Sequence, residues 1–226
     1  MDKIKFNTEA YKLKFEDSKV GRETYLRIKK SLSLIGKGKK VLDVGCYDGY
    51  ISNKIKDLGN VVIGMEISKE GVKLAKERGI DCFFGDVEGK FPFKDQEFDV
   101  VFAGEIIEHV FDTDLFLSEI KRVLKKDGFL VLTTPNIAAF NRRLKLFIGK
   151  NPDIDIGLVN YEGKGRSAGH IRYFTKKSLE KLLKRNGFYI QSFMVDCILV
   201  NGFRFDLLSK LFPSLGWSLI VKAKLN

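Results

Sequence analysis

The sequence predicts an α/β fold in which a doubly wound, largely parallel sheet carries helices on both faces. Short runs of β-branched and aromatic residues alternate with helical patterns, which is typical of parallel strands joined by crossover helices. A chain of 226 residues, 44% of them hydrophobic and 31% charged, suits one sizeable globular core. We therefore expect a single domain over residues 1–226.

Seven runs have the length and composition of strands: Lys40–Val44, Val61–Met65, Asp81–Phe84, Phe98–Ala103, Phe129–Thr134, Phe188–Phe193 and Ser218–Lys224. Between them, Ser68, Thr113 and Thr175 are placed to cap the N-termini of three helices. The first of these helices is expected to stop at Gly79, and the last before Gly187 in left-handed geometry.

Three segments lie outside this framework. Residues 1–39 form a basic, amphipathic helical lead, or lid, in which Tyr25, Ile28, Leu32 and Ile35 make an apolar stripe. Residues 136–175 and 197–217 are basic or apolar insertions expected on the substrate side of the sheet. A helix of that character either closes the core or rests on an anionic membrane surface, so peripheral membrane contact is left open.

Charge and hydropathy restrict the cellular location of the protein and the kinds of partner it can bind. No stretch reaches the ~20 uncharged apolar residues of a membrane span, and the polar start of the chain does not indicate secretion, so we expect a cytoplasmic protein. The net charge is +11, yet residues 41–120 hold 8 basic and 17 acidic side chains. The basic flanks either meet an anionic partner or only solvate helix faces.

A glycine-rich turn follows the first strand, in the run Asp43-Val44-Gly45-Cys46-Tyr47-Asp48-Gly49. Such a turn brings backbone N–H groups close to a ligand. The spacing Gly45-x-x-x-Gly49 differs from a dinucleotide fingerprint. Asp43, expected at the mouth of the site, would repel a pyrophosphate but attract the ammonium and sulfonium groups of S-adenosylmethionine. These residues predict a site for a cationic nucleoside.

Further acids follow the next strands. Glu66, beside Ile67, ends the second strand 21 residues after Gly45, where a carboxylate can accept both ribose hydroxyls. Asp86 follows the third strand and can accept from an adenine amino group, while Val87 packs against the ring. Each acid alone is equally consistent with a solvated loop residue.

The motif series VLDVGCYDGY, VIGMEIS, GDV, FDVVFAGEIIEHV and RVLKKDGFLVLTTPN resembles that of the class I S-adenosylmethionine-dependent methyltransferases, over about residues 38 to 190. Within that family it is similar to the small-molecule branch that includes the ubiquinone-pathway O-methyltransferases. The resemblance implies a Rossmann-like seven-stranded sheet in the order 3-2-1-4-5-7-6 with its last strand antiparallel. It also implies a cofactor site formed by Asp43, Gly45, Cys46, Gly49, Glu66, Ile67, Asp86, Val87 and Glu105.

On the acceptor side, Glu105, Glu108 and His109 form an E-x-x-E-H run whose spacing places all three on one helical face. The run resembles that of ubiquinone-pathway O-methyltransferases and small-RNA 2′-O-methyltransferases, in which a distant histidine completes a metal site. His170 stands at about the matching place, so the four residues are candidate ligands for Mg²⁺ or Mn²⁺. In the alternative without a metal, Glu108 and His109 orient the cofactor loop, and His109 or His170 is the catalytic base.

The function expected from these features is O-methylation of a small or carrier-linked hydroxyl substrate, of sugar, lipid or quinol type. Two alternatives stay open. One is an RNA methyltransferase, which the basic flanks favour and the lack of a recognisable RNA-binding appendage disfavours. The other is a regulatory protein that binds S-adenosylmethionine without catalysis, which the intact acids Asp43, Glu66 and Asp86 disfavour. The oligomeric state is not indicated.

Overall fold

The computed structural model describes residues 22–152, 169–200 and 202–226, and the strands in these ranges form one large sheet and one small ribbon. The large sheet contains β1 (Lys40–Val44), β2 (Val61–Glu66), β3 (Asp81–Phe84), β4 (Phe98–Gly104), β5 (Leu124–Pro135), β6 (Phe188–Val195) and β9 (Ser218–Leu225). The ribbon pairs β7 (Ile198–Val200) with β8 (Phe203–Phe205). All seven strands expected from the sequence are present, with β5 beginning five residues early.

The strand order of the large sheet is β3-β2-β1-β4-β5-β9-β6. Strands β1 to β5 pair in parallel, whereas β9 runs antiparallel to both β5 and β6. Because β7 and β8 belong to the separate ribbon, β9 is the seventh strand of the large sheet in chain order. The expected order 3-2-1-4-5-7-6, with its last strand antiparallel, is therefore confirmed.

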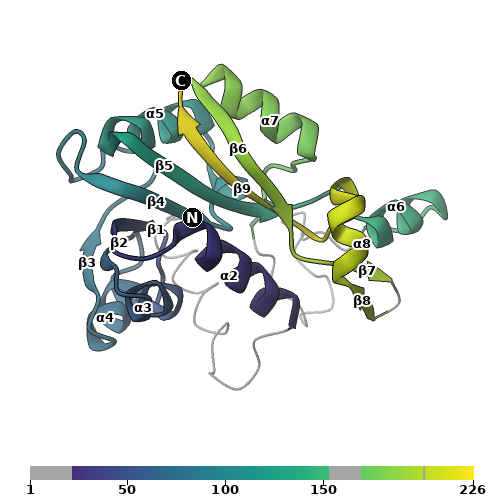
Figure 1. The fold of residues 1–226 in the computed structure, drawn as a ribbon, viewed down its shortest axis with the longest axis horizontal. Coiled ribbons are helices and arrows are strands. Elements are labelled where there is room, and N and C mark those ends of the chain that lie inside the picture. Colours follow the sequence, from purple (N-terminus) through teal and green to yellow (C-terminus); the bar gives the residue numbers. More distant parts are fainter. Residues whose placement is uncertain (1–21, 153–168, 201) are drawn as a thin grey trace.

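Helices cover both faces of the sheet. The described helices are α2 (Arg22–Ile35), α3 (Tyr50–Asp57), α4 (Lys69–Glu77), α5 (Thr113–Val123), α6 (Phe140–Phe147), α7 (Lys176–Arg185) and α8 (Asp206–Leu211), with 3₁₀ turns at Ile107–His109 and Pro213–Leu215. Of these, α6 and α8 lie at one end of the sheet, beside the small ribbon. Figure 1 shows α5 and α7 above the sheet and α2, α3 and α4 below it. The doubly wound arrangement predicted from the alternation is therefore confirmed.

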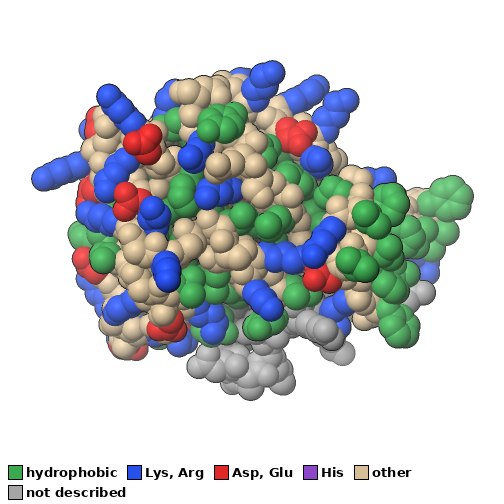
Figure 2. All heavy atoms as spheres, viewed as in Figure 1, with side chains coloured by type: hydrophobic (Ala, Val, Ile, Leu, Met, Phe, Trp, Pro, Cys, Tyr) green, Lys and Arg blue, Asp and Glu red, His purple; other side chains and the backbone are tan. Residues whose placement is uncertain are grey.

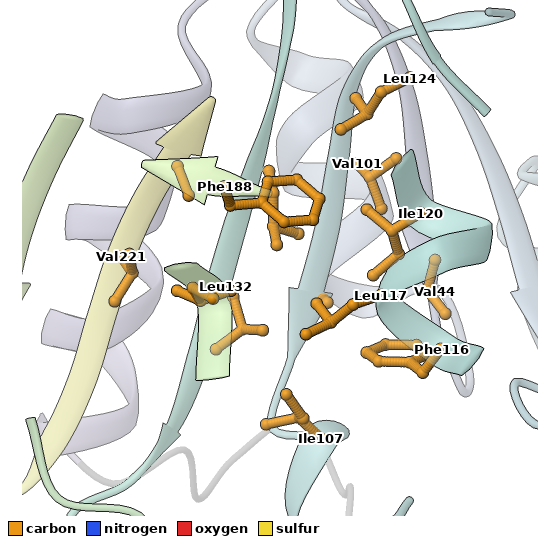
Figure 3. Packing of buried hydrophobic residues seen from close by; sticks show 14 of the residues in the cluster. Val44, Val101, Ile107, Phe116, Leu117, Ile120, Leu124, Leu132, Phe188 and Val221 are labelled. Atoms are coloured by element: carbon orange, nitrogen blue, oxygen red, sulfur yellow. The ribbon is translucent and has the colours of Figure 1, made fainter. Parts of the chain in front are cut away.

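The larger of the two main hydrophobic clusters lies between the sheet and α5 and α7. Figure 3 shows Phe116, Leu117 and Ile120 of α5 facing Val44 and Val101 of the parallel strands. A second cluster packs Ile35 of α2 and Ile55 of α3 on the opposite face. Side chains on successive strand residues point to opposite faces, so strands buried on both sides need nearly continuous apolar runs. This burial holds the carboxyl ends of β1, β2 and β4 in fixed positions.

The helix ends follow local sequence signals. Ser68 accepts a hydrogen bond from Gly71 N at 3.2 Å, and Thr175 forms a capping box with Ser178. Gly79 and Gly187 have φ of 76° and 80°, the left-handed geometry expected after a helix. The expectation for Thr113 is wrong: Asp112 is the cap.

The α5 cap is aspartate because the carboxylate reaches two free donors at once. Oδ1 of Asp112 accepts from Asp114 N at 3.1 Å and from Leu115 N at 2.9 Å. Thr113 is the first helical residue, and its side chain is buried. Both aspartate and threonine are common N-terminal caps, so residue type alone placed the start of α5 one position late.

The described parts of the three segments outside the framework form α2, α6, α8 and the small ribbon. Helix α2 lies within the expected lead 1–39, with Ile28 and Ile35 buried but Tyr25 57% exposed. Helix α6 belongs to the insertion 136–175, of which residues 153–168 lie outside the described ranges. The insertion 197–217 forms β7, β8 and α8, and α6 contacts β7. None of the described helices is long and apolar enough to cross a bilayer.

Candidate active site

The turn between β1 and α3 has the backbone geometry that its glycines predict. Gly45 and Gly49 have φ of 74° and 75°. A Cβ on Gly45 would lie 2.9 Å from Cδ1 of Ile106, which follows β4, and a Cβ on Gly49 would lie 3.1 Å from the Cα of Ala75. Side chains are excluded at both positions by conformation and by contact. The turn therefore lies directly against the segment after β4.

Asp43 lies beneath this turn rather than at its mouth. It is 2% exposed, and its Oδ2 accepts a hydrogen bond from the Ser52 hydroxyl at 2.5 Å. Burial raises the pKa of Asp43 to about 7; the Ser52 hydrogen bond lowers it in part, and the negative charge of Glu66 raises it further. No basic side chain of the described residues pairs with Asp43. A bound cation would supply the missing counter-charge.

Glu66 is held at the end of β2 by backbone donors. Its Oε2 accepts from Tyr47 N at 3.0 Å and its Oε1 from Ser68 N at 2.8 Å, so the side chain bridges the turn and the start of α4. Burial raises the pKa of Glu66, and the N–H groups of Ser68, Tyr47 and Ile67 counter that rise. A carboxylate has about four acceptor positions, so two hydroxyl donors can still be accommodated.

Cys46 contributes its backbone to the turn but points its side chain away. Its Sγ lies 3.4 Å from Sγ of Cys82, in a small buried cluster with Ala75 and Ile80. A Cβ on Gly64 would lie only 2.6 Å from the Cys46 Sγ, so the thiol fills the space above that glycine. Of the predicted cofactor residues, Cys46 can therefore offer only main-chain atoms.

Asp86 and Val87 follow β3 as predicted. Oδ1 of Asp86 accepts from Glu88 N at 2.9 Å, and Gly89 N donates to its carbonyl, so the segment is a compact turn. Val87 is partly buried against the main hydrophobic cluster. The groove between α2 and α3, about 870 Å³ in volume, is lined by Tyr25, Leu32 and Leu58 and by none of the predicted cofactor residues.

Glu105 has a left-handed backbone, with φ of 54°, which is uncommon for a residue with a side chain. Its Oε1 accepts from the Thr133 hydroxyl at 3.0 Å, and its Oε2 forms an ion pair with Arg27 of α2 at 3.0 Å. The predicted lid is thus attached to the end of β4. Backbone strain of this kind concentrates at functional sites.

Glu108, His109 and His170 come together although 60 residues separate the histidines. Their ligand atoms all lie within 4.8 Å of one another, and the two imidazole rings are 4.8 Å apart. Glu105 is not part of this group, because its oxygens face Thr133 and Arg27. Three of the four predicted metal ligands are therefore adjacent.

The environment of Glu108 is unusual for a carboxylate. The residue is 1% exposed, and its Oε2 accepts a hydrogen bond from the Thr134 hydroxyl at 3.0 Å. Its Oε1 has no hydrogen-bond partner among the described residues and lies 3.9 Å from Nε2 of His170. Burial and the nearby charge of Glu105 raise the pKa of Glu108 well above its usual value. An orphaned buried carboxylate oxygen fits a site that receives a cation or a proton.

Two further buried charges were not anticipated from the sequence. Arg142 of α6 is 4% exposed and lies over the Trp217 ring at 4.0 Å, and burial lowers its pKa to about 10. Asp196 is fully buried; burial raises its pKa to about 6, and the N–H groups of Ser218 and Cys197 counter that rise. For Asp196, a charged residue inside an apolar run was the available signal, whereas Arg142 stands between Asn141 and Arg143 and gave none.

Comparison with known proteins gives the family. Residues 19–192 match the family described as Methyltransferase domain. The mitochondrial ubiquinone biosynthesis O-methyltransferase of Bos taurus is 28% identical over 164 residues, 69% of this chain and 42% of that protein. The ubiquinone biosynthesis O-methyltransferase of Pelagibacter ubique is 35% identical over 119 residues, 50% of this chain and 46% of that protein.

This chain thus spans less than half of the length of these two relatives. Among solved structures, a SAM-dependent methyltransferase of Methanosarcina mazei superposes with a TM-score of 0.65 at 22% identity, covering 85% of this chain and 95% of that one. Such a likeness supports the fold, and the family match covers most of the sheet, the glycine turn and the Glu108–His109 segment. The chain belongs to the methyltransferase domain family.

Proposed function

We propose that the protein transfers a methyl group from S-adenosylmethionine to a hydroxyl oxygen of a small or carrier-linked substrate of sugar, lipid or quinol type. The observation that carries the proposal is the contact between the glycine turn and the segment after β4, through Gly45 and Ile106. Asp43 lies on β1 just before this turn and Glu66 accepts a hydrogen bond from Tyr47 within it, so the contact supports a donor site close to the segment that bears Glu108 and His109. A donor site and a proton-handling site then share one edge of the sheet.

The donor side has three roles for the chain's own residues. Asp43, buried without a basic partner among the described residues, supplies a negative field under the turn once it is ionised, which a bound cation would favour. Glu66 accepts ribose hydroxyls on lone pairs left free by its two backbone donors. Asp86 and Val87 border the base. The bound sulfonium makes its methyl carbon electrophilic, so the protein mainly positions the acceptor in line with it.

The acceptor side requires removal of a hydroxyl proton. His109 and His170 are the histidines of the chain, and His109 is oriented by its Nδ1, which lies 3.2 Å from the Gly169 carbonyl. Histidine titrates near neutrality and can accept such a proton. Arg142 is a candidate to contact a negatively charged acceptor, because its Nε has no hydrogen-bond partner among the described residues.

The cluster Glu108–His109–His170 also fits a divalent metal ion. Thr134 holds one Glu108 oxygen, and the other has no hydrogen-bond partner in the described part of the chain. A backbone carbonyl orients His109, as is usual around metal-binding histidines. Glu108, His109 and His170 would hold the ion, which would lower the pKa of a bound hydroxyl. Two histidines beside a carboxylate favour Mn²⁺ over Mg²⁺, since Mg²⁺ prefers oxygen ligands.

The similarity to proteins named ubiquinone biosynthesis O-methyltransferases supports a phenolic or otherwise hydroxylated acceptor over RNA. A screen with methyl-labelled S-adenosylmethionine against catechols, hydroquinones, sugars and short RNA tests this choice. We expect label on a hydroxyl oxygen of one small-molecule class. Transfer to RNA alone would overturn the proposal, as would cofactor binding without transfer to any acceptor.

The metal is tested separately, by Mn²⁺ binding followed by paramagnetic resonance. The wild type should bind Mn²⁺, and His170→Ala should lose most of that binding. The matched control Glu70→Gln changes an exposed carboxylate on α4 and should bind as the wild type does. Methyl transfer that is unchanged after exhaustive chelation would exclude the metal and leave His109 or His170 as the base.

A further inference from the structure

The elements α6, β7, β8 and α8 present a continuous set of exposed apolar side chains. Figure 2 shows hydrophobic side chains gathered on the right of the molecule, over the elements that Figure 1 labels α6, α8, β7 and β8. We call this the α6–α8 surface; its apolar members are Leu144, Leu146, Phe147, Ile148, Phe203, Phe205, Leu207, Leu208, Leu211 and Phe212. Phe147 is 88% exposed and Leu207 74% exposed. Such patches mark interaction sites.

The charges within this surface have one dominant sign. Its basic residues are Arg143, Lys145, Lys150, Arg204 and Lys210. Residues 140–150 contain no acid, and residues 202–216 contain only Asp206, which forms an ion pair with Lys30 of α2. Apolar tips with a surplus of basic side chains complement an interface that is apolar inside and anionic at its surface.

We propose that the α6–α8 surface docks on an anionic lipid bilayer, with Phe147 and Leu207 entering the headgroup region. The elements that carry the tips are short: α6 has eight residues, α8 six, and the ribbon strands three each. Figure 1 shows them projecting from the sheet at one end of the molecule. Projecting apolar tips insert readily between lipid headgroups, and the basic side chains beside them contact lipid phosphates.

The surface is also joined to the candidate active site. Helix α6 follows Asn136, the residue after β5, and Nη1 of Arg142 donates to the Asn136 carbonyl at 2.6 Å. Asp206, the first residue of α8, is tied through Lys30 to α2, which in turn reaches Glu105 through Arg27. Docking would therefore hold the acceptor side of the protein close to the membrane, where a lipid-carried substrate lies. The docking itself does not depend on the proposed methyl acceptor.

The test is co-sedimentation of the full chain with vesicles of phosphatidylcholine alone and of phosphatidylcholine with about one third phosphatidylglycerol. We expect binding to the anionic vesicles, weakened by added salt. The double variant Phe147→Glu/Leu207→Glu should bind about tenfold or more weakly, because it removes two apolar anchors and adds two negative charges. Both residues are exposed, so folding should be retained, as circular dichroism would verify.

Matched controls separate this surface from the overall positive charge. Val61→Glu introduces one such negative charge at a residue 65% exposed at the start of β2, and it should bind as the wild type does. Lys145→Gln/Lys150→Gln should weaken binding, whereas Lys69→Gln/Lys76→Gln on α4 should not.

Three results would overturn the proposal. They are absence of wild-type binding to anionic vesicles, equal binding by Phe147→Glu/Leu207→Glu, and a stable dimer in light scattering that this double variant dissociates. The last result would show that a second copy of the chain covers the surface. Because sedimentation requires no methyl acceptor, failure of the proposed reaction would leave this result interpretable.

Discussion

Replacing Asp43 by asparagine should alter the response of this protein to pH in two opposite ways. The carboxylate is 2% exposed, and its pKa is raised from 3.8 to about 7 by burial. A shift of that size corresponds to at most about 4 kcal/mol of unfolding free energy, at about 1.36 kcal/mol per pKa unit. Asparagine keeps the shape and can still accept from the Ser52 hydroxyl, but it does not ionise.

For the free protein, the unfolded chain loses the Asp43 proton near pH 4, whereas the folded protein keeps it until about pH 7. The folded state then binds more protons, so the free energy of unfolding falls as pH rises through this window and is level above it. Urea unfolding of Asp43→Asn should lack this part of the decline. The control Asp57→Asn, at an exposed position on α3, should decline as the wild type does.

The affinity for the cofactor should depend on pH in the opposite direction, because a cationic ligand binds better to the ionised form of Asp43. Calorimetry should show the wild-type affinity for S-adenosylmethionine rising between about pH 5 and pH 7, by up to about tenfold per unit. Asp43→Asn should bind more weakly at pH 8 and lose that component of the rise. Parallel pH profiles for wild type and variant, in both unfolding and binding, would refute the reasoning.

Three further changes test single contacts. Glu66→Gln replaces one carboxylate oxygen by an NH₂ group that faces a backbone N–H donor. Calorimetry should show that this variant binds S-adenosylmethionine about 10- to 100-fold more weakly than the wild type, whereas the exposed control Glu70→Gln should bind without change. A double-mutant cycle on Arg27→Gln and Glu105→Gln, measured by urea unfolding, should give a coupling free energy of about 1 kcal/mol, since the ion pair is only partly exposed. A coupling of zero would contradict the attachment of α2 to Glu105. Asp112→Ala should lower the free energy of unfolding by about 1 kcal/mol, and an unchanged midpoint would contradict its role as the α5 cap.

The positions of the proposed cofactor residues in the fold were accessible from the sequence because their determinants are local. The turn from Gly45 to Gly49, the acid at the end of β2 and the turn at Asp86 each follow a strand within a few residues. Parallel strands align their carboxyl ends at one edge, so recognising the strands also brings the motifs together. The strand order and its antiparallel last member followed from the family resemblance and are confirmed by the structure.

The direction of individual side chains was less predictable. Cys46 lies within the glycine turn after β1, yet its thiol packs against Cys82, because Gly64 on the neighbouring strand leaves room for it. Asp43 was expected at the mouth of the site and lies beneath it, bound to Ser52. Both outcomes depend on which residue occupies the adjacent strand or helix, and spacing within one motif carries no information about that neighbour.

By itself, the sequence determined the α/β class, the positions of the strands, the glycine turn after the first strand and the residue types available for proton or metal chemistry. Only the tertiary structure decided that Glu108, His109 and His170 meet without Glu105, that Arg27 ties α2 to Glu105, and that the apolar residues of α6 and α8 share one surface. The physical reason is the range of the interactions. Hydrogen bonding within a turn and the side-chain period of a strand act over a few residues, whereas a contact between residues 60 or more positions apart exists only after the core between them has packed.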